Sequence, residues 1–254
     1  MAAEAWPRWR AHDPNSTRDI DHGAWDALLA KHRRDAPDGI ARFDYDALAA
    51  SRADRAELKA YLARLGATPI SGYARDAQMA CWIDLYNALT IDVVVDHWPV
   101  ASIRDIRISP GWFSVGPWGR KLIAVEGEEV SLDDIEHRIL RPLWADPRIH
   151  YAVNCASLGC PDLPARAVTA ANLEATLAQG AADFVNHPRG HRIEGGRLRV
   201  SSIYEWFKAD FGGTDSGVIA HLRAHADPER ARALDAVARI SGHDYDWAIN
   251  RAPR

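Results

Sequence analysis

The longest helical pattern in the sequence covers residues 76–98 and ends before Pro99, a residue that disfavours helix in the position before it. The apolar residues on one face of this helix are Met79, Ile83, Tyr86, Thr90 and Val94. Asn87 lies on the same face, and a buried asparagine has up to four hydrogen bonds to satisfy. It would bind substrate, orient a catalytic histidine or hold a loop backbone. Asp84 is close enough to join its network.

The rest of the chain alternates shorter helical patterns with short apolar runs. Helices are predicted over residues 24–31, 45–65, 131–144, 171–184, 217–225 and 228–238. Strands are predicted over residues 103–108, 121–125 and 148–154, and a hairpin over 191–200 around Gly195-Gly196. Ser131 and Ser202 each begin a capping-box pattern. These patterns predict an α+β fold, a helix-rich single domain over residues 21–254 with a small antiparallel or mixed sheet, preceded by a polar N-terminal arm over residues 1–20.

Composition and charge narrow the classes of function. The 254 residues are 47% hydrophobic and 26% charged, as in ordinary globular domains. The net charge is -4 and Lys and Arg form no stripe, so we expect no nucleic-acid partner. No apolar run approaches the roughly 20 residues that span a bilayer, so no integral membrane segment is predicted.

The first residues, Met1-Ala-Ala-Glu-Ala-Trp6, contain neither a basic nor an apolar signal region. The alanine-rich start is nevertheless typical of the residues around a signal cleavage site. We therefore expect a mature exported protein, periplasmic or secreted rather than cytoplasmic.

A second polar group falls on an apolar helix face. The stripe of the helix that follows Ser131 contains Leu132, Ile135, Ile139 and Leu143. Glu136 lies inside this stripe and His137 lies toward its edge. A carboxylate in an apolar interface is paired, hydrogen-bonded or protonated, so Glu136 is either a catalytic group or a structural one that holds a neighbouring loop.

The segment from His150 to Cys160 is the strongest candidate site. It ends in a turn rich in small residues, Cys155-Ala-Ser-Leu-Gly-Cys160-Pro. Such a turn can direct backbone N–H groups at an oxyanion, and a cysteine nucleophile needs a base within reach, here His150 or His137. The alternatives are two inert buried cysteines or, in an exported protein, a disulfide.

Other features carry less information. His221 and His225 are four residues apart on a predicted helix, but no HExxH pattern accompanies them, and we interpret them as a solvated face. The sequence predicts no metal site and no cofactor. Trp112, Phe113 and Trp118 either line a ligand cleft or belong to the core.

Five runs of the sequence, in order, resemble the family known as domain of unknown function 547. They are residues 81–90, 131–141, 148–161, 202–212 and 245–250, and the resemblance covers roughly residues 20–252. The family's helical motif usually reads Trp-Ile-Asn-Leu-Tyr-Asn, whereas Asp84 stands here at the first Asn. The resemblance implies no established reaction. It implies that Asn87, Glu136, His137, His150 and the two cysteines are motif positions, and that bacterial relatives often carry a secretion signal.

Three functions are compatible with this sequence. The first hypothesis is a cysteine-dependent hydrolase or acyl transferase, distantly papain- or transglutaminase-like, acting on a small peptide-like, amide or thioester substrate. Cys155, or alternatively Cys160, would be the nucleophile, His137 or His150 the base, and Glu136 or Asn87 its orienter. Expected substrate-binding residues are Asn87, Asp84, Tyr86, Asn154 and Ser157. The second hypothesis is a non-catalytic module that binds a small thiol, peptide or anion. The third is a thiol–disulfide redox partner that cycles Cys155 and Cys160.

Overall fold

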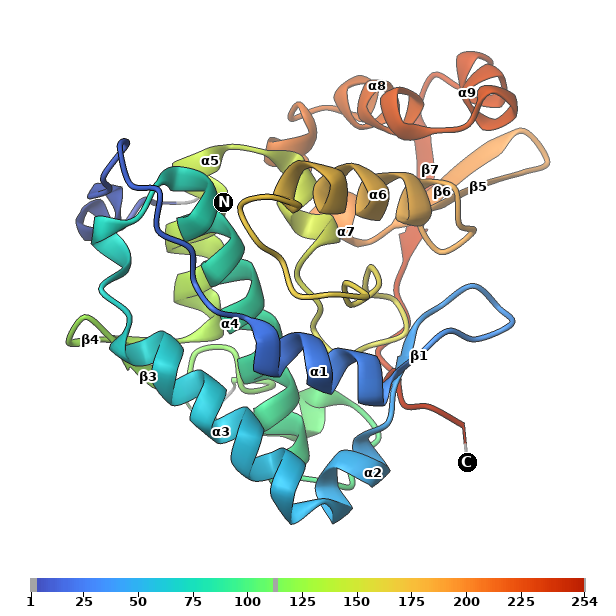
Figure 1. Cartoon of the computed structure of the whole chain (residues 1–254). Coiled ribbons are helices and arrows are strands. Elements are labelled where there is room, and N and C mark those ends of the chain that lie inside the picture. The colour runs from blue at the N-terminus through green and yellow to red at the C-terminus, as the bar shows by residue number, and fades with distance from the viewer. Residues whose placement is uncertain (1–3, 112–113, 254) are drawn as a thin grey trace.

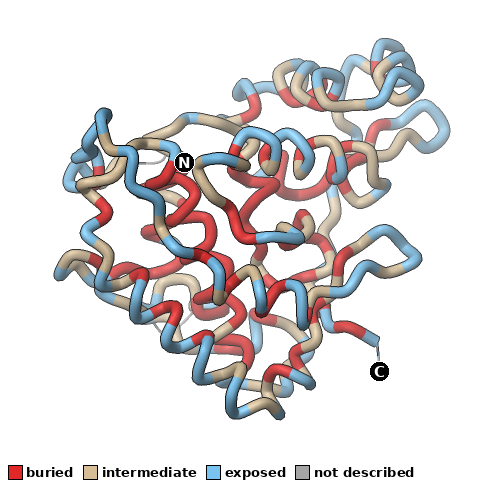
Figure 2. The backbone as a smooth tube through the Cα atoms, viewed as in Figure 1, coloured by how far each residue is buried: buried red, intermediate tan, exposed pale blue. Residues whose placement is uncertain are grey.

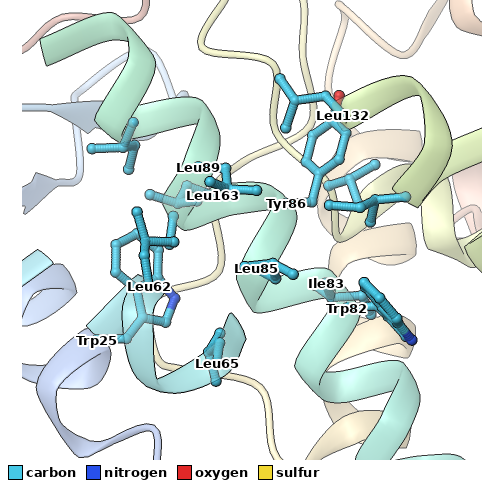
Figure 3. Packing of buried hydrophobic residues seen from close by; sticks show 14 of the residues in the cluster. Trp25, Leu62, Leu65, Trp82, Ile83, Leu85, Tyr86, Leu89, Leu132 and Leu163 are labelled. Atoms are coloured by element: carbon cyan, nitrogen blue, oxygen red, sulfur yellow. The ribbon is translucent and has the colours of Figure 1, made fainter. Parts of the chain in front are cut away.

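Helix α4 (Arg75–Asp96) lies at the centre of the molecule, and the other elements of the larger core pack around it (Figure 1). The computed structural model describes residues 4–111 and 114–253. Most α4 side chains from Ala77 to Val95 are buried, on every face of the helix. In Figure 3, α4 passes between Trp25 and Leu62 on one side and Leu132 on the other. A helix that is apolar all round belongs in a core, so α4 is the scaffold of the domain.

The other α-helices of the described residues are shorter than α4. Their bounds are α1 Gly23–His32, α2 Tyr45–Ala50, α3 Arg52–Ala67, α5 Arg141–Trp144, α6 Leu173–Val185, α7 Ile203–Trp206, α8 Asp215–His225 and α9 Pro228–Asp235. A π-helical segment, Asp134–Leu140, leads directly into α5. Ser131 opens this run with the predicted capping box, because its hydroxyl accepts the Asp134 N–H while Asp134 accepts the Ser131 N–H.

Over residues 4–111 and 114–253, the strands form three small sheets. β1 (Arg33–Arg34) pairs with β2 (Arg42–Phe43), and β3 (Ile123–Val125) pairs with β4 (Glu128–Val130), both antiparallel. β5 (His191–Glu194) and β6 (Arg197–Ser201) form the predicted hairpin, with Gly195 and Gly196 at positive φ in the turn. β7 (Ile240–Asp244) adds to β6 in parallel. The expectation of a helix-rich α+β fold with a small mixed sheet is therefore confirmed.

Buried apolar residues form two clusters. The larger surrounds α4, and the smaller joins α6 and α8 to the β5–β7 sheet. Figure 2 shows buried backbone through the region of α4 and a more exposed periphery at α8 and α9. The segment 150–160 runs from one cluster to the other, since Tyr151 belongs to the smaller and Ala152, Val153 and Ala156 belong to the larger.

The expected single helix over residues 45–65 is two helices. Ser51 takes an extended conformation between α2 and α3, and its hydroxyl accepts the Asp54 N–H as the N-cap of α3. A serine that competes for local backbone bonds favours a helix end over a helix interior. Ser202 behaves otherwise than predicted: it makes no capping bond and its hydroxyl instead contacts His243 Nδ1 at 2.9 Å.

Two predicted strands are wrong. Residues 103–105 form a 3₁₀ turn capped by Ser102, and Pro147–Tyr151 form another, in place of a strand over 148–154. Asp146 begins the second turn, because its carboxylate accepts the Arg148 N–H at 2.8 Å. Pro147 fits the first position of the turn, because it has no N–H that would need an acceptor there. Short apolar runs do not distinguish a strand from a buried turn.

The segment before α1 lies against the domain. Pro7–Arg10 form a 3₁₀ turn, Trp9 is buried, and the Trp6 N–H donates to the Arg138 carbonyl. The alanine-rich start at residues 1–3, Trp112 and Phe113 lie outside the described residues. Within the described part of the chain, none of the helices has the length and apolar character required to cross a bilayer.

We predict that Leu85→Ala lowers the free energy of unfolding by about 2–5 kcal/mol, because it opens a cavity in the buried centre of α4. Urea unfolding followed by tryptophan fluorescence measures this. Val115→Ala, at an exposed apolar side chain, is the control and should change stability by less than about 0.5 kcal/mol. Equal effects of the two substitutions would contradict the central position of α4.

Candidate functional site

A tight turn brings the two cysteines of the candidate segment together. Ala156 takes a left-handed conformation with φ 60°, which reverses the chain directly after Cys155. The sulfur atoms of Cys155 and Cys160 then lie 2.7 Å apart. This is longer than the ~2.05 Å of a disulfide bond, and both cysteines are free thiols. The C-x4-C spacing therefore produces a contact between two thiols.

The buried amide side chains of Asn87 and Asn154 hold this turn through hydrogen bonds. Asn87 Nδ2 donates to the Ala152 carbonyl at 2.9 Å, and Asn87 Oδ1 accepts the Asn154 N–H at 2.8 Å. Asn154 in turn accepts the Ala156 N–H and donates to the Pro161 carbonyl. Asn87 therefore has the last of the three roles that the sequence allowed, the binding of a loop backbone. Both asparagines, expected to contact substrate, are engaged with the turn.

The C-terminal segment docks on the same turn and delivers Tyr245. Leu158 and Gly159 donate to the carbonyls of Ala248 and Asp246, each at 2.8 Å. A side chain at Gly159 would come within 2.8 Å of the Asp246 nitrogen, so only glycine permits this approach. The Tyr245 hydroxyl consequently lies 3.1 Å from Cys155 Sγ, 3.2 Å from Cys160 Sγ and 2.8 Å from Ser157 Oγ.

The bonds to sulfur separate the acidities of the two thiols. The hydrogen bond to Cys160 raises the pKa of Cys155 well above its usual value, and burial adds to this. Burial alone would also raise the pKa of Cys160, but bonds from the Cys155 thiol, the Tyr245 hydroxyl and the Cys155 N–H lower it to about 7. These interactions favour the thiolate on Cys160 and the protonated thiol on Cys155.

The N–H groups of residues 158–160 are not free to act as the expected oxyanion donors. The N–H groups of Leu158 and Gly159 are bonded to the C-terminal segment, and the Cys160 N–H donates to the Ser157 carbonyl. The Cys155 N–H points at the Cys160 sulfur, 3.0 Å away. These donors hold the turn and the thiolate, and they are not directed at a substrate oxygen.

The π-helical segment brings Glu136 and His137 close to His150. A π-helix widens the turn, so neighbouring side chains can reach the same side, and such segments are frequent at functional sites. Glu136 Oε1 lies 3.8 Å from His137 Nδ1 and 3.7 Å from His150 Nδ1. Both imidazoles therefore approach one buried carboxylate without forming a hydrogen bond to it.

His150 is fixed by an ion-paired aspartate that the sequence analysis did not select. Asp210 accepts from His150 Nε2 at 2.8 Å and from Arg141 Nε at 2.6 Å. Burial would raise the pKa of Asp210, but the bonds from His150 and Arg141 hold it well below its usual range. Arg141 also donates to His137 Nδ1 at 3.1 Å, which assigns the proton of a neutral His137 to Nε2.

Both groups of residues line one cleft of about 180 Å³. Its lining contains Cys155, Cys160 and Tyr245 together with Glu136, His137 and His150. Among the described side chains, neither sulfur is hydrogen-bonded to an imidazole; the partners of both are thiol, hydroxyl and N–H groups. The expected Cys–His pair is therefore replaced by a Cys–Cys–Tyr cluster that shares the cleft with the histidines.

The remaining predicted residues are divided between this cleft and other parts of the core. Ser157 belongs to the sulfur cluster, 3.3 Å from Cys155 Sγ, and Tyr86 lines the cleft. Asp84 lies elsewhere: it accepts from Trp25 Nε1 and the Val168 N–H, and burial raises its pKa well above its usual value. Asp84 and Asn87 therefore belong to separate networks, although one turn of helix separates them.

Aromatic rings form the mouth of the cleft, and of these the sequence analysis selected only Trp118 as a possible cleft residue. Trp206 stacks on Trp247 with ring centres 5.5 Å apart, and Tyr245 and Trp118 contact Trp247 at 4.6 Å and 5.8 Å. Phe207 stacks on His150 at 4.4 Å. The family resemblance was the signal that could have identified these residues. Its runs contain Tyr245, Trp206, Phe207 and Asp210.

Histidines outside the cleft form no metal site. His221 differs from the expected solvated residue, since its Nε2 lies 2.7 Å from the buried Tyr151 hydroxyl. Over the described residues, no group of three or more histidine, cysteine or carboxylate side chains is arranged to hold a metal ion.

The comparisons with known proteins give a family and no function. Residues 70–185 match the family described as "Protein of unknown function, DUF547". This part of the chain contains α4, the π-helical segment and the cysteine turn. No curated protein and no solved structure matches the chain.

We predict that Asn87→Ala destabilises the fold, because the Ala152 carbonyl and the Asn154 N–H are left buried without partners, at about 1–3 kcal/mol each. Denaturant unfolding measures the loss. Asn15→Ala, an exposed asparagine, is the matched control and should remain within about 0.5 kcal/mol of wild type. A variant as stable as wild type would show that Asn87 does not hold the turn.

Proposed function

We propose that the protein is a thiol–disulfide exchange protein in which Cys155 and Cys160 cycle between dithiol and disulfide. The observation that carries this proposal is the 2.7 Å contact between the two sulfur atoms, with the Tyr245 hydroxyl and the Cys155 N–H directed at Cys160. Bonds to sulfur that favour the thiolate produce the reactive form at neutral pH. A small movement of the two sulfurs closes the S–S bond.

The exchange uses both cysteines. Cys155, the less buried of the two, passes its proton to Cys160 and attacks one sulfur of a partner disulfide. This forms a mixed disulfide and releases the first partner thiolate, which takes the proton from Cys160. The Cys160 thiolate then attacks Cys155, closes the Cys155–Cys160 bond and releases the second partner sulfur as a thiolate. Two electrons pass from the dithiol to the partner disulfide.

The experiment is a redox titration. The protein is equilibrated with reduced and oxidised glutathione at a series of ratios, and free thiols are counted by mass after alkylation. We expect two thiols to disappear together in one two-electron transition, with Cys81→Ala behaving as wild type because Cys81 is a buried free thiol outside the cleft lining. Cys155→Ser and Cys160→Ser should each abolish this two-thiol transition, and at most one thiol should then be lost, through a mixed disulfide with glutathione. An unchanged thiol count across all ratios would contradict the proposal.

The acidity of the pair gives an independent prediction. The thiolate forms as pH rises through the pKa of Cys160, so its ultraviolet absorbance should increase with a midpoint near pH 7. Tyr245→Phe removes a hydrogen bond that favours the thiolate, so its midpoint should move upward, toward the ordinary cysteine range. Tyr73→Phe, at a half-buried tyrosine away from the cleft, should retain the wild-type midpoint. Equal midpoints for Tyr245→Phe and wild type would remove Tyr245 from the mechanism.

A second candidate is the cysteine-dependent hydrolase or acyl transferase, with Cys155 as the nucleophile. The observation that favours it is the presence of Glu136, His137 and His150 in the same cleft as the thiols. It requires a movement that brings an imidazole to sulfur and supplies new oxyanion donors. Turnover of a small thioester that is lost in both Cys155→Ser and His150→Gln supports it. If no thioester turnover is detected and the redox transition is intact, only the exchange function remains supported.

A further inference from the structure

A buried carboxylate without a hydrogen bond faces the cleft. Glu136 is only 8% exposed and lines the cavity. Within the part of the chain that the structure describes, no donor lies within hydrogen-bond distance of it, and the two imidazole nitrogens stay 3.7 Å and 3.8 Å away. A desolvated carboxylate left in this state is costly. The missing partner is therefore expected to come from the cleft side.

Apart from its histidines, the charged residues of the lining are carboxylates. Asp133 joins Glu136 there, and the described lining residues contain neither lysine nor arginine. The Arg141 guanidinium reaches the edge of the lining, where it donates to His137 Nδ1, and it is ion-paired with Asp210. Burial raises the pKa of Asp133, the charge of His137 opposes this rise, and the repulsion from Glu136 adds to it. A positive group in the cavity would relieve this repulsion, and a negative one would increase it.

The aromatic rings at the mouth of the cleft also favour a cation. Ring faces attract cations, by roughly 0.5–2 kcal/mol at exposed to desolvated sites. Arg104 already lies over the Trp247 ring with its guanidinium 5.2 Å from the ring centre. Trp206 remains 43% exposed, which is unusual for so large an apolar side chain. Its ring lies beside those of Tyr245 and Trp247, so the entrance is aromatic and leads toward Glu136.

We propose that the cleft selects partners in which an ammonium or guanidinium group lies close to the reacting sulfur, such as a cationic aminothiol or a cysteine flanked by a basic residue. Glu136 binds the cation, and the aromatic rings of Trp206 and Trp247 line its path. This inference rests on the proposed exchange function. It replaces the anionic ligand of the earlier binding hypothesis with a cationic one.

Three small disulfides of similar size test the selection: cystamine is cationic, bis(2-hydroxyethyl) disulfide is neutral and dithiodiglycolate is anionic. Each rate of oxidation of the protein is divided by the rate of the same disulfide with dithiothreitol, which removes its intrinsic reactivity. We expect the normalised rate for cystamine to exceed that for the neutral disulfide by about tenfold, with the anionic disulfide slowest. Equal normalised rates, or a preference for the anion, would overturn the inference.

Matched variants locate the selectivity. Glu136→Gln removes the charge from the cleft and should bring the cystamine-to-neutral ratio within about twofold of one. Glu205→Gln removes the same charge from an exposed position outside the lining and should keep the wild-type ratio. A ratio that persists in Glu136→Gln would show that general surface charge, and not this carboxylate, sets the preference.

A binding measurement separates this inference from the exchange function. Tryptophan fluorescence of Cys155→Ser is titrated with propylammonium and with propionate, which contain no sulfur. Saturable quenching by propylammonium alone supports the cationic cleft even if no disulfide reacts faster with wild type than with Cys155→Ser. Absence of that preference, together with a normal redox transition, refutes the cationic selection and leaves the exchange function in place.

Discussion

The side-chain amide of Asn87 is the interaction on which the geometry of the site depends. It sits on the fully buried helix α4 and bonds both to the Ala152 carbonyl and to the Asn154 N–H, so the rigid centre of the fold determines the path of the cysteine turn. A buried amide whose bonds are all made to backbone specifies one arrangement and opposes others. The left-handed Ala156 and the docked C-terminal segment then follow, and Cys155 meets Cys160 and Tyr245.

Two groups of side chains in the cleft differ in their chemistry. The first contains sulfur atoms that share a proton and whose negative charge is stabilised by Tyr245 and a backbone N–H. The second contains Glu136 between two imidazoles, one of which is bound to the ion-paired Asp210. Because no histidine is needed to stabilise the thiolate, the second group can serve another function. The charge and aromatic character of the cavity favour the recognition of a cation as that function.

The sequence predicted the parts of this structure that depend on local chemistry. The helix centred on residues 76–98, the Ser131 capping box and the Gly195-Gly196 hairpin are encoded by spacing and by single residue types, and all three are present. The segment 148–154 was predicted wrongly, because a short apolar run fits a strand as well as a buried 3₁₀ turn. Tyr245 and Asp210 reach the site through long-range docking, which no local pattern in residues 150–160 records.

The measurement that tests the central claim most directly is the trapping of a mixed disulfide. Cys160→Ser protein is exposed to a small disulfide and analysed by peptide mass spectrometry. Because the resolving thiol is missing, the account predicts a stable adduct on Cys155, whereas wild type should show the Cys155–Cys160 disulfide and little adduct. Cys155 left unmodified in the variant, or wild type that retains the adduct without closing the internal bond, would contradict the account.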